Sequence, residues 1–148
     1  MNDIYQPPAA EVTTSIPTTA DFKLYKISGV GLATVLGSPI AGGILMSQNF
    51  RRLGNQAAAN KTLVLSILGT IAVFVIAYFI PENIDVPGAA LTVPQLIIMI
   101  MLTKQFQESD IKQHQEAGGI MASNWKAFGI AILVVLGLIA LATPFVYF

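Results

Sequence analysis

The chain has 148 residues, of which 54% are hydrophobic and 11% are charged, and its mean hydropathy is +0.67. Ordinary soluble domains carry about 25% charged residues. Because a soluble fold of this length could not hide so much apolar surface, the composition indicates one membrane domain. The zero net charge without a long basic run argues against nucleic acid as a partner, and the absence of Cys excludes disulfides and thiolate metal sites.

Residues 1–27 are predicted to form a disordered polar tail. Pro7, Pro8 and Pro17 lie among Thr, Ser and Ala, a composition that cannot bury enough apolar surface to order itself. The tail has no continuous apolar core, so it does not read as a signal peptide. At its end, aromatic and basic side chains are expected to anchor the chain at the membrane surface: Phe22, Lys23, Tyr25 and Lys26.

The first membrane segment, residues 28–50, is distinguished by small residues. They recur at every fourth position as Gly29, Ala33, Gly37 and Ala41, which we call the small-residue stripe. In lipid, close contact rather than water exclusion holds helices together, so the stripe predicts a helix-packing face.

The middle of this segment carries a helix breaker. Pro39, next to Ser38, removes a backbone hydrogen bond and is expected to kink the helix. Two structures fit this pattern. One is a kinked helix that spans the membrane and packs, and the other is a re-entrant or broken helix that lines a cavity.

Three further apolar segments follow, at residues 62–80, 89–103 and 127–148. The first of them rises about 28 Å as a helix, which matches a hydrocarbon core of about 30 Å. The second is short and is expected to continue as a cytoplasmic helical stalk over residues 104–117. Within the stalk, Glu108 and Lys112, and Asp110 and His114, are spaced to pair across one helical turn.

The predicted fold class is therefore an all-α polytopic membrane helix bundle. It has either four transmembrane helices or three plus a re-entrant first segment, all within a domain over residues 28–148. Basic residues cluster in the loops 51–61 and 104–126, whereas the loop between the second and third segments has none. The positive-inside rule places these two loops in the cytoplasm. Four spans then leave both termini in the periplasm, whereas a re-entrant first segment brings the N-terminal tail to the cytoplasmic side.

Three stretches together resemble a family of small, uncharacterised bacterial integral membrane proteins. They are GSPIAGGILMSQNFRRLG, IPENIDVP, and QESDIKQHQEAGG with the following SNWKAFGI. The similarity covers most of residues 25–140. It implies a bacterial inner-membrane location, and it supplies no reaction, ligand or site residue.

Chemistry inside the membrane is constrained by what the apolar segments lack. None of the four contains Asp, Glu, Lys, Arg or His. Proton-coupled carriers normally keep a titratable group at membrane depth, so that class is disfavoured. The sequence is still compatible with a passive conduction path, or with a cavity lined by Thr, Ser and Gln95 near Pro39. We expect no catalytic residue, metal site or cofactor.

Two candidate sites lie at the membrane surface. Arg51, Arg52 and Lys61 could hold an anionic lipid headgroup, although orientation alone also requires them. A second candidate, Asp110 with His114 and Glu116, could form an interfacial polar site in which a carboxylate orients the imidazole, or could be a solvated helix face.

The leading functional hypothesis is a non-catalytic membrane protein that acts through helix packing, as a homo-oligomer or as an accessory subunit of a membrane complex. Its expected partners are the lipid bilayer and either a second copy or another membrane protein. The alternative is a small passive transporter or channel that uses the Gly- and Pro-broken first segment. A third possibility is an interfacial enzyme.

Overall fold

The structure is a computed structural model, which describes residues 21–81 and 83–147. This part of the chain forms four helices, as the all-α prediction requires: α1 (Ile27–Arg52), α2 (Gln56–Tyr78), α3 (Gly88–Glu116) and α4 (Asn124–Tyr147). Each is long and apolar enough to span a membrane. Residues 1–20, most of the expected disordered tail, lie outside the described residues.

Helix α1 is not one straight rod. The backbone leaves helical geometry at Gly37 and Ser38, just before Pro39, so two helical arms meet there. The amide N–H of Tyr25 donates to Oδ1 of Asn49 at 2.8 Å, and Nδ2 of Asn49 donates back to the carbonyl of Tyr25 at 3.0 Å. In a straight helix these residues would lie about 36 Å apart. The two arms are therefore antiparallel, and α1 is a helical hairpin whose tip is Gly37–Ser38.

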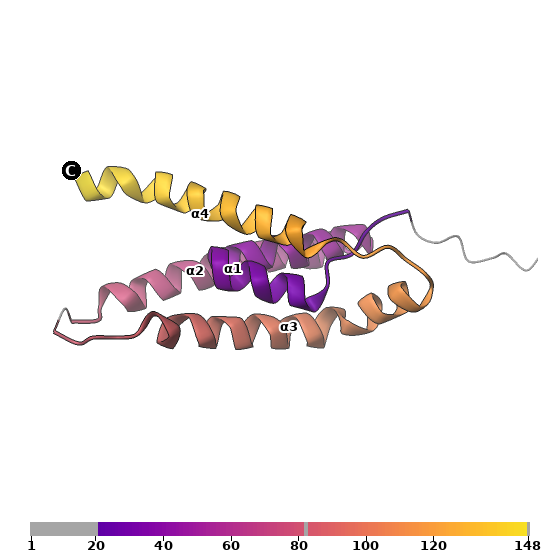
Figure 1. Cartoon of the computed structure of the whole chain (residues 1–148), viewed down its shortest axis with the longest axis horizontal. Coiled ribbons are helices and arrows are strands. Elements are labelled where there is room, and N and C mark those ends of the chain that lie inside the picture. Colours follow the sequence, from indigo (N-terminus) through magenta and orange to yellow (C-terminus); the bar gives the residue numbers. More distant parts are fainter. Residues whose placement is uncertain (1–20, 82, 148) are drawn as a thin grey trace, which may run out of the picture.

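Contacts between the two arms confirm the hairpin. A Cβ atom added to Gly42 in the second arm would collide with Oγ1 of Thr34 in the first arm and lie 3.3 Å from the carbonyl of Val30. At the base of the hairpin, the Arg52 guanidinium donates to the carbonyl of Lys23. Figure 1 shows the two arms side by side in the middle of the molecule.

A buried polar network closes the base of the hairpin and ties it to α3. Asn49 and Gln107 are both completely buried. Nδ2 of Asn49 donates to Oε1 of Gln107 at 3.2 Å, and Nε2 of Gln107 donates to the carbonyl of Met46 at 2.8 Å. Because a buried amide must be hydrogen-bonded to be tolerated, this network fixes the register of both arms against α3.

The hairpin is the centre of the bundle, and the other helices pack around it. α1 contacts each of α2, α3 and α4, while contacts among these three outer helices are nearly absent. The most apolar part of α1 is two-thirds buried, whereas the corresponding parts of the outer helices remain largely exposed. Figure 1 shows α4 diverging from α2 and α3 toward its C-terminal end.

The hairpin also decides which segments lie at the same end of the bundle. Both ends of α1, the α1–α2 turn and the α3–α4 connection lie at one end, which we call the basic end (Figure 1). The α2–α3 loop and the end of α4 lie at the other end. A membrane crossed by the three outer helices therefore cannot be crossed by α1. Of the two predicted architectures, three helices plus a re-entrant first segment is the one that fits this geometry.

The helix bounds differ from the expected segments mainly at the basic end. α2 begins at Gln56 rather than near residue 62, because Oδ1 of Asn55 accepts from the amide of Ala58 and caps the helix. α3 runs without a break from Gly88 to Glu116, so the polar residues 104–116 continue the apolar helix. At the start of α4, the hydroxyl of Ser123 accepts from the amide of Trp125.

The segment before α1 is packed rather than free, which corrects the expected tail boundary at residue 27. Leu24 is completely buried, and its carbonyl accepts from the amide of Ala122 at 2.8 Å. The expected surface anchor is also partly internal. Tyr25 is buried beneath the guanidinium of Arg52, and the Phe22 ring stacks on His114 at 5.1 Å.

We expect Asn49→Ala to destabilise the fold strongly. The change leaves the backbone of Tyr25 and the amide of Gln107 buried without their partner, and each such group costs about 1–3 kcal/mol. Thermal unfolding in detergent, followed by circular dichroism, measures the effect. The control is Asn60→Ala, which removes an exposed amide bonded only to Gln56. Equal loss of stability in the two variants would contradict the role of the network.

Candidate functional site

The tip of the hairpin lies at mid-depth of the bundle. Ser38 borders a pocket together with Thr70 of α2 and Gln95 of α3. These two residues lie near the middle of the apolar stretches of their helices. The candidate functional site is thus a pocket in front of a helix break, about halfway along the spanning segments.

This pocket, which we call the tip pocket, has a volume of about 200 Å³. Five of its eight lining side chains are polar and none is ionisable: Thr34, Ser38, Thr70, Thr92 and Gln95, with Val35, Val73 and Phe74 as the apolar wall. Such a lining is unusual at membrane depth, because polar groups facing hydrocarbon are costly. In membrane proteins, non-helical backbone is tolerated between spanning helices only inside protein or beside a polar cavity, and the tip lies in such surroundings.

Ser38 is the most unusual residue of the tip pocket. Its φ of 71° and ψ of 175° belong to a backbone region that is almost exclusive to Gly and costs about 1–3 kcal/mol elsewhere. Its hydroxyl oxygen is buried and has no hydrogen-bond partner. A strained residue with an unsatisfied hydroxyl at the border of a cavity marks a place where a ligand or water would gain a hydrogen bond.

The small-residue stripe packs against other parts of the same chain. All four of its residues are buried, and they face α4 or the other arm of the hairpin. A Cβ atom on Gly37 would lie 2.6 Å from Cβ of Ala41 and 2.9 Å from the carbonyl oxygen of Ala131, and one on Gly29 would lie 3.5 Å from Cβ of Ala127. The predicted packing face is therefore occupied by the chain itself, so it is not open to a second copy.

Two further glycines allow the second arm to approach its neighbours. A Cβ atom at Gly43 would collide with the side chain of Ser66 in α2, and one at Gly42 would lie 3.0 Å from Cε of Met99 in α3. Glycines of the hairpin thus lie at close contacts with all three outer helices. In such contacts the absence of a side chain allows close approach of the helix backbones.

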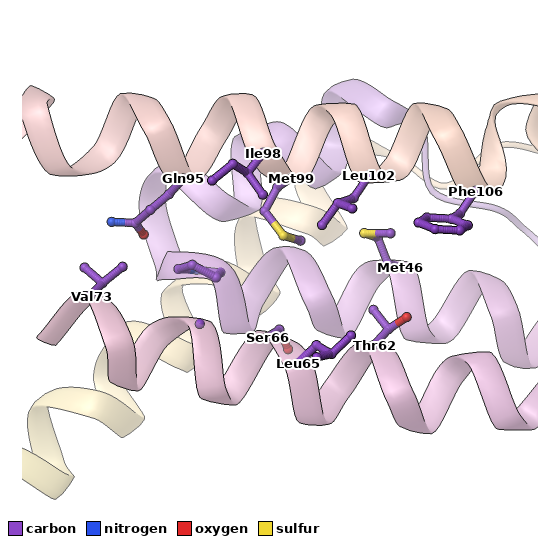
Figure 2. Close-up of a pocket in the computed structure, with 12 residues that line it drawn as sticks. Met46, Thr62, Leu65, Ser66, Val73, Gln95, Ile98, Met99, Leu102 and Phe106 are labelled. Atoms are coloured by element: carbon purple, nitrogen blue, oxygen red, sulfur yellow. The ribbon is translucent and has the colours of Figure 1, made fainter. Parts of the chain in front are cut away.

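A second, apolar cavity of about 230 Å³ runs beside the second arm, between α2 and α3. Figure 2 shows Met46 and Phe106 toward one end of this groove, and Val73 and Gln95 toward the other. Val73 and Gln95 line both cavities, so the apolar groove adjoins the tip pocket.

Only part of the expected site for a lipid headgroup has exposed side chains. Arg52 is committed to the carbonyl of Lys23 and to the ring of Tyr25, whereas Arg51 and Lys61 are exposed. The guanidinium of Arg52 therefore closes the base of the hairpin at its partly exposed surface.

The expected interfacial polar site is not assembled. His114 is buried, stacks on Phe22, and places Nε2 at 3.2 Å from the carbonyl of Ile120. Glu116 is exposed, and no hydrogen bond joins it or Asp110 to His114 in the described part of the chain. His114 thus packs the segment before α1 against the end of α3.

The other pair expected in the stalk is confirmed. Nζ of Lys112 lies 2.8 Å from Oε1 of Glu108, one helical turn away. This hydrogen bond and the attraction between the charges lower the pKa of Glu108 and raise the pKa of Lys112. Both side chains are solvent-exposed, so the pair is a surface feature of α3 with little weight in stability.

Sequence reasoning identified part of this site. Pro39, Ser38 and Gln95 were expected near a cavity, whereas Thr70 and Thr92 were not singled out. Threonine within an apolar helix is a weak signal, because its hydroxyl can bond to the carbonyl one turn earlier, as both of these do. Their common orientation toward the tip becomes visible only when the hairpin is in place.

Comparisons with protein-family models, with curated proteins and with solved structures find no match to this chain. The functional interpretation therefore depends on the geometry of the residues described above.

We expect Gly37→Ala to lower the stability of the single chain. The added methyl group would press on Ala41 and on the backbone of Ala131, and overpacking of this kind typically costs about 1–3 kcal/mol. The matched control is Gly137→Ala, where the space around the Cβ position is open and the unfolding temperature should stay equal or rise. Thermal unfolding and oligomeric size in detergent are measured together. Loss of association at unchanged stability would instead show that the stripe is an interface between copies.

Proposed function

We propose that this protein is a small passive transport protein, in which the hairpin α1 re-enters the membrane and its tip pocket receives the solute. The observation that carries the proposal is the fold-back of α1. The hydrogen bonds between Tyr25 and Asn49 bring both ends of α1 together, and the polar pocket lies at the opposite end of the hairpin. Broken or re-entrant helices with polar backbone at mid-membrane are a common way to build solute sites.

The proposed topology has three spanning helices and one re-entrant hairpin. All eight basic residues belong to the half of the molecule nearer the basic end, and the α2–α3 loop at the other end contains Asp85 and no basic residue. The positive-inside rule then places the basic end in the cytoplasm. The described segment 21–26 lies there as well, and the end of α4 lies on the outer side. We propose the bacterial inner membrane as the location, on the family resemblance.

A passive mechanism suits the chemistry of the tip pocket. Its lining has no ionisable side chain, so nothing in it can bind and release a proton during a transport cycle. The pocket runs from Thr34 and Val35 of the first arm past the tip to Phe74 of α2, which follows Ser66, the α2 residue that faces Gly43 in the second arm. We propose that it works as a half-channel that the packed arms close on the cytoplasmic side.

The hairpin itself is the proposed gate. Near the tip, its closest contacts with the outer helices are made by Gly37 and Gly43, which meet the small residues Ala131 and Ser66. Small residues can slide against each other more easily than interlocked large side chains. Among the described residues, the hydrogen bonds of Asn49 and Gln107 at the base are the polar contacts with α3 that such a movement would have to loosen. A small displacement of the tip would then connect the pocket to the cytoplasmic side.

A second candidate function keeps the leading hypothesis from the sequence, a non-catalytic subunit of a homo-oligomer or membrane complex. The observation in its favour is that the three outer helices barely touch each other and expose large apolar side chains, among them Phe74, Leu133 and Leu136. The association would then use these outer faces and not the small-residue stripe. A monomeric protein in both detergent and nanodiscs would contradict it.

The topology can be tested by labelling single cysteines, since the chain has no native Cys. In sealed vesicles of known orientation, we expect Asp21→Cys, Asn55→Cys and Gln115→Cys to react from the cytoplasmic side and Asn83→Cys from the outer side. A membrane-impermeant maleimide, added before and after permeabilisation, gives the readout. Labelling of Asp21→Cys from the outer side would show that α1 spans the membrane and would contradict the re-entrant hairpin.

Transport is tested with purified protein in phospholipid vesicles. We expect small solutes of at least one class to pass faster than through protein-free vesicles, measured by stopped-flow light scattering for neutral solutes and by ion-sensitive dyes for salts. The panel is glycerol, urea, potassium, chloride and nitrate. Vesicles that contain denatured protein, which no longer gives a helical circular dichroism spectrum, serve as the control for leakage. No increase for any member of the panel would contradict the proposed function.

A further inference from the structure

We propose that the tip pocket selects small, uncharged, hydrogen-bonding solutes, of the polyol or urea type, and rejects inorganic ions. This inference rests on the proposed transport function and names its substrate class. It follows from three properties of the pocket, which are its hydrogen-bonding groups, its electrostatic neutrality and its size.

The hydrogen-bonding groups of the pocket are mostly acceptors. Thr70 and Thr92 each donate their hydroxyl hydrogen to the carbonyl four residues earlier, so that their oxygens keep free lone pairs. The hydroxyl of Thr34 makes the same bond but lies against Gly42 in the second arm. Gln95 uses one N–H toward the carbonyl of Leu91, which leaves its amide oxygen and second N–H for a ligand. A solute with several O–H or N–H donors matches this lining.

One donor is also in place. The buried hydroxyl of Ser38 has no partner in the protein, and it is held at the border of the pocket by the strained backbone of the tip. Its oxygen is shielded in this conformation, so a small shift of the tip is needed to turn it toward the pocket. A solute bonded to it after such a shift would satisfy a group that the fold leaves unsatisfied among the described residues.

The pocket offers no counter-charge to an ion. None of its lining residues is ionisable. The first arm of α1 ends at the tip with its carbonyl groups, and the second arm begins there with its N–H groups. The opposite partial charges of these two helix ends lie side by side and largely cancel. An ion would lose its hydration without a counter-charge, which costs far more than the burial of a neutral polar molecule.

The size of the pocket sets an upper limit on the solute. Its volume of about 200 Å³ has room for a molecule of several non-hydrogen atoms, because one water molecule occupies about 30 Å³ in the liquid. Val35, Val73 and Phe74 form an apolar wall against which the carbon chain of such a molecule can pack. Polar contacts on one side and an apolar wall on the other fit a short polyol.

The test compares glycerol and urea with potassium, chloride and nitrate in vesicles that contain the full-length protein. We expect the wild type to raise glycerol or urea permeability at least several-fold over protein-free vesicles, with ion fluxes unchanged. The double variant Thr70→Val with Gln95→Leu keeps the size of these side chains and removes their polar groups. We expect it to return permeability to the background.

Two further variants separate loss of the site from loss of the fold. Thr143→Val removes a hydroxyl with the same bond to the carbonyl four residues earlier, on the exposed face of α4, and should transport like the wild type. Ser38→Gly relieves the backbone strain at the tip, so its unfolding temperature should not fall while its permeability does.

The outcomes distinguish this inference from the proposed function. Ion flux without glycerol or urea flux would overturn the substrate class and leave the transport function in place. Flux of none of the solutes would overturn both. Glycerol or urea flux that is unchanged in Ser38→Gly and in the folded double variant would show that the path avoids the tip pocket, and would also overturn the inference.

Discussion

The hydrogen bonds between the side chain of Asn49 and the backbone of Tyr25 are the constraint on which the rest of the structure depends. An amide side chain buried among apolar helices is stable only when its donors and acceptor are paired. Asn49 finds these partners in the residue just before α1 and in Gln107 of α3. Both ends of a segment long enough to cross a membrane are thereby held at the same end of the bundle.

The architecture follows from this closure. A hairpin in the centre of three helices must be thin, which explains why its arms contain glycine at their closest approaches to each other and to the outer helices. Because the hairpin ends halfway along the bundle, the outer helices cannot pack on it beyond the tip, and α4 diverges from α2 and α3 there (Figure 1). The same geometry leaves broken backbone at mid-depth, where the threonines and Gln95 provide a polar environment for it.

The sequence was sufficient to predict the four apolar helices, since apolar runs and their breakers are local features. Through Ser38 and Pro39 it also indicated two alternatives for the first segment, a kinked spanning helix or a re-entrant one. It could not choose between these two alternatives. The choice depends on contacts of Asn49 with residues 24 and 58 positions away, and an asparagine near the end of an apolar segment carries no information about its partner. The small-residue stripe predicted close packing correctly but not what packs there. His114 and Arg52, which looked available for chemistry or lipid binding, are instead used to hold the segment before α1.

The distance between the two ends of α1 tests the hairpin most directly. Spin labels on Lys26→Cys and Arg51→Cys, both at exposed positions, can be measured by pulsed electron resonance in nanodiscs. The hairpin predicts a separation typical of neighbouring helices, about 8–10 Å between axes plus the reach of the labels. A separation near 38 Å, about 1.5 Å for each residue of one continuous helix, would contradict it.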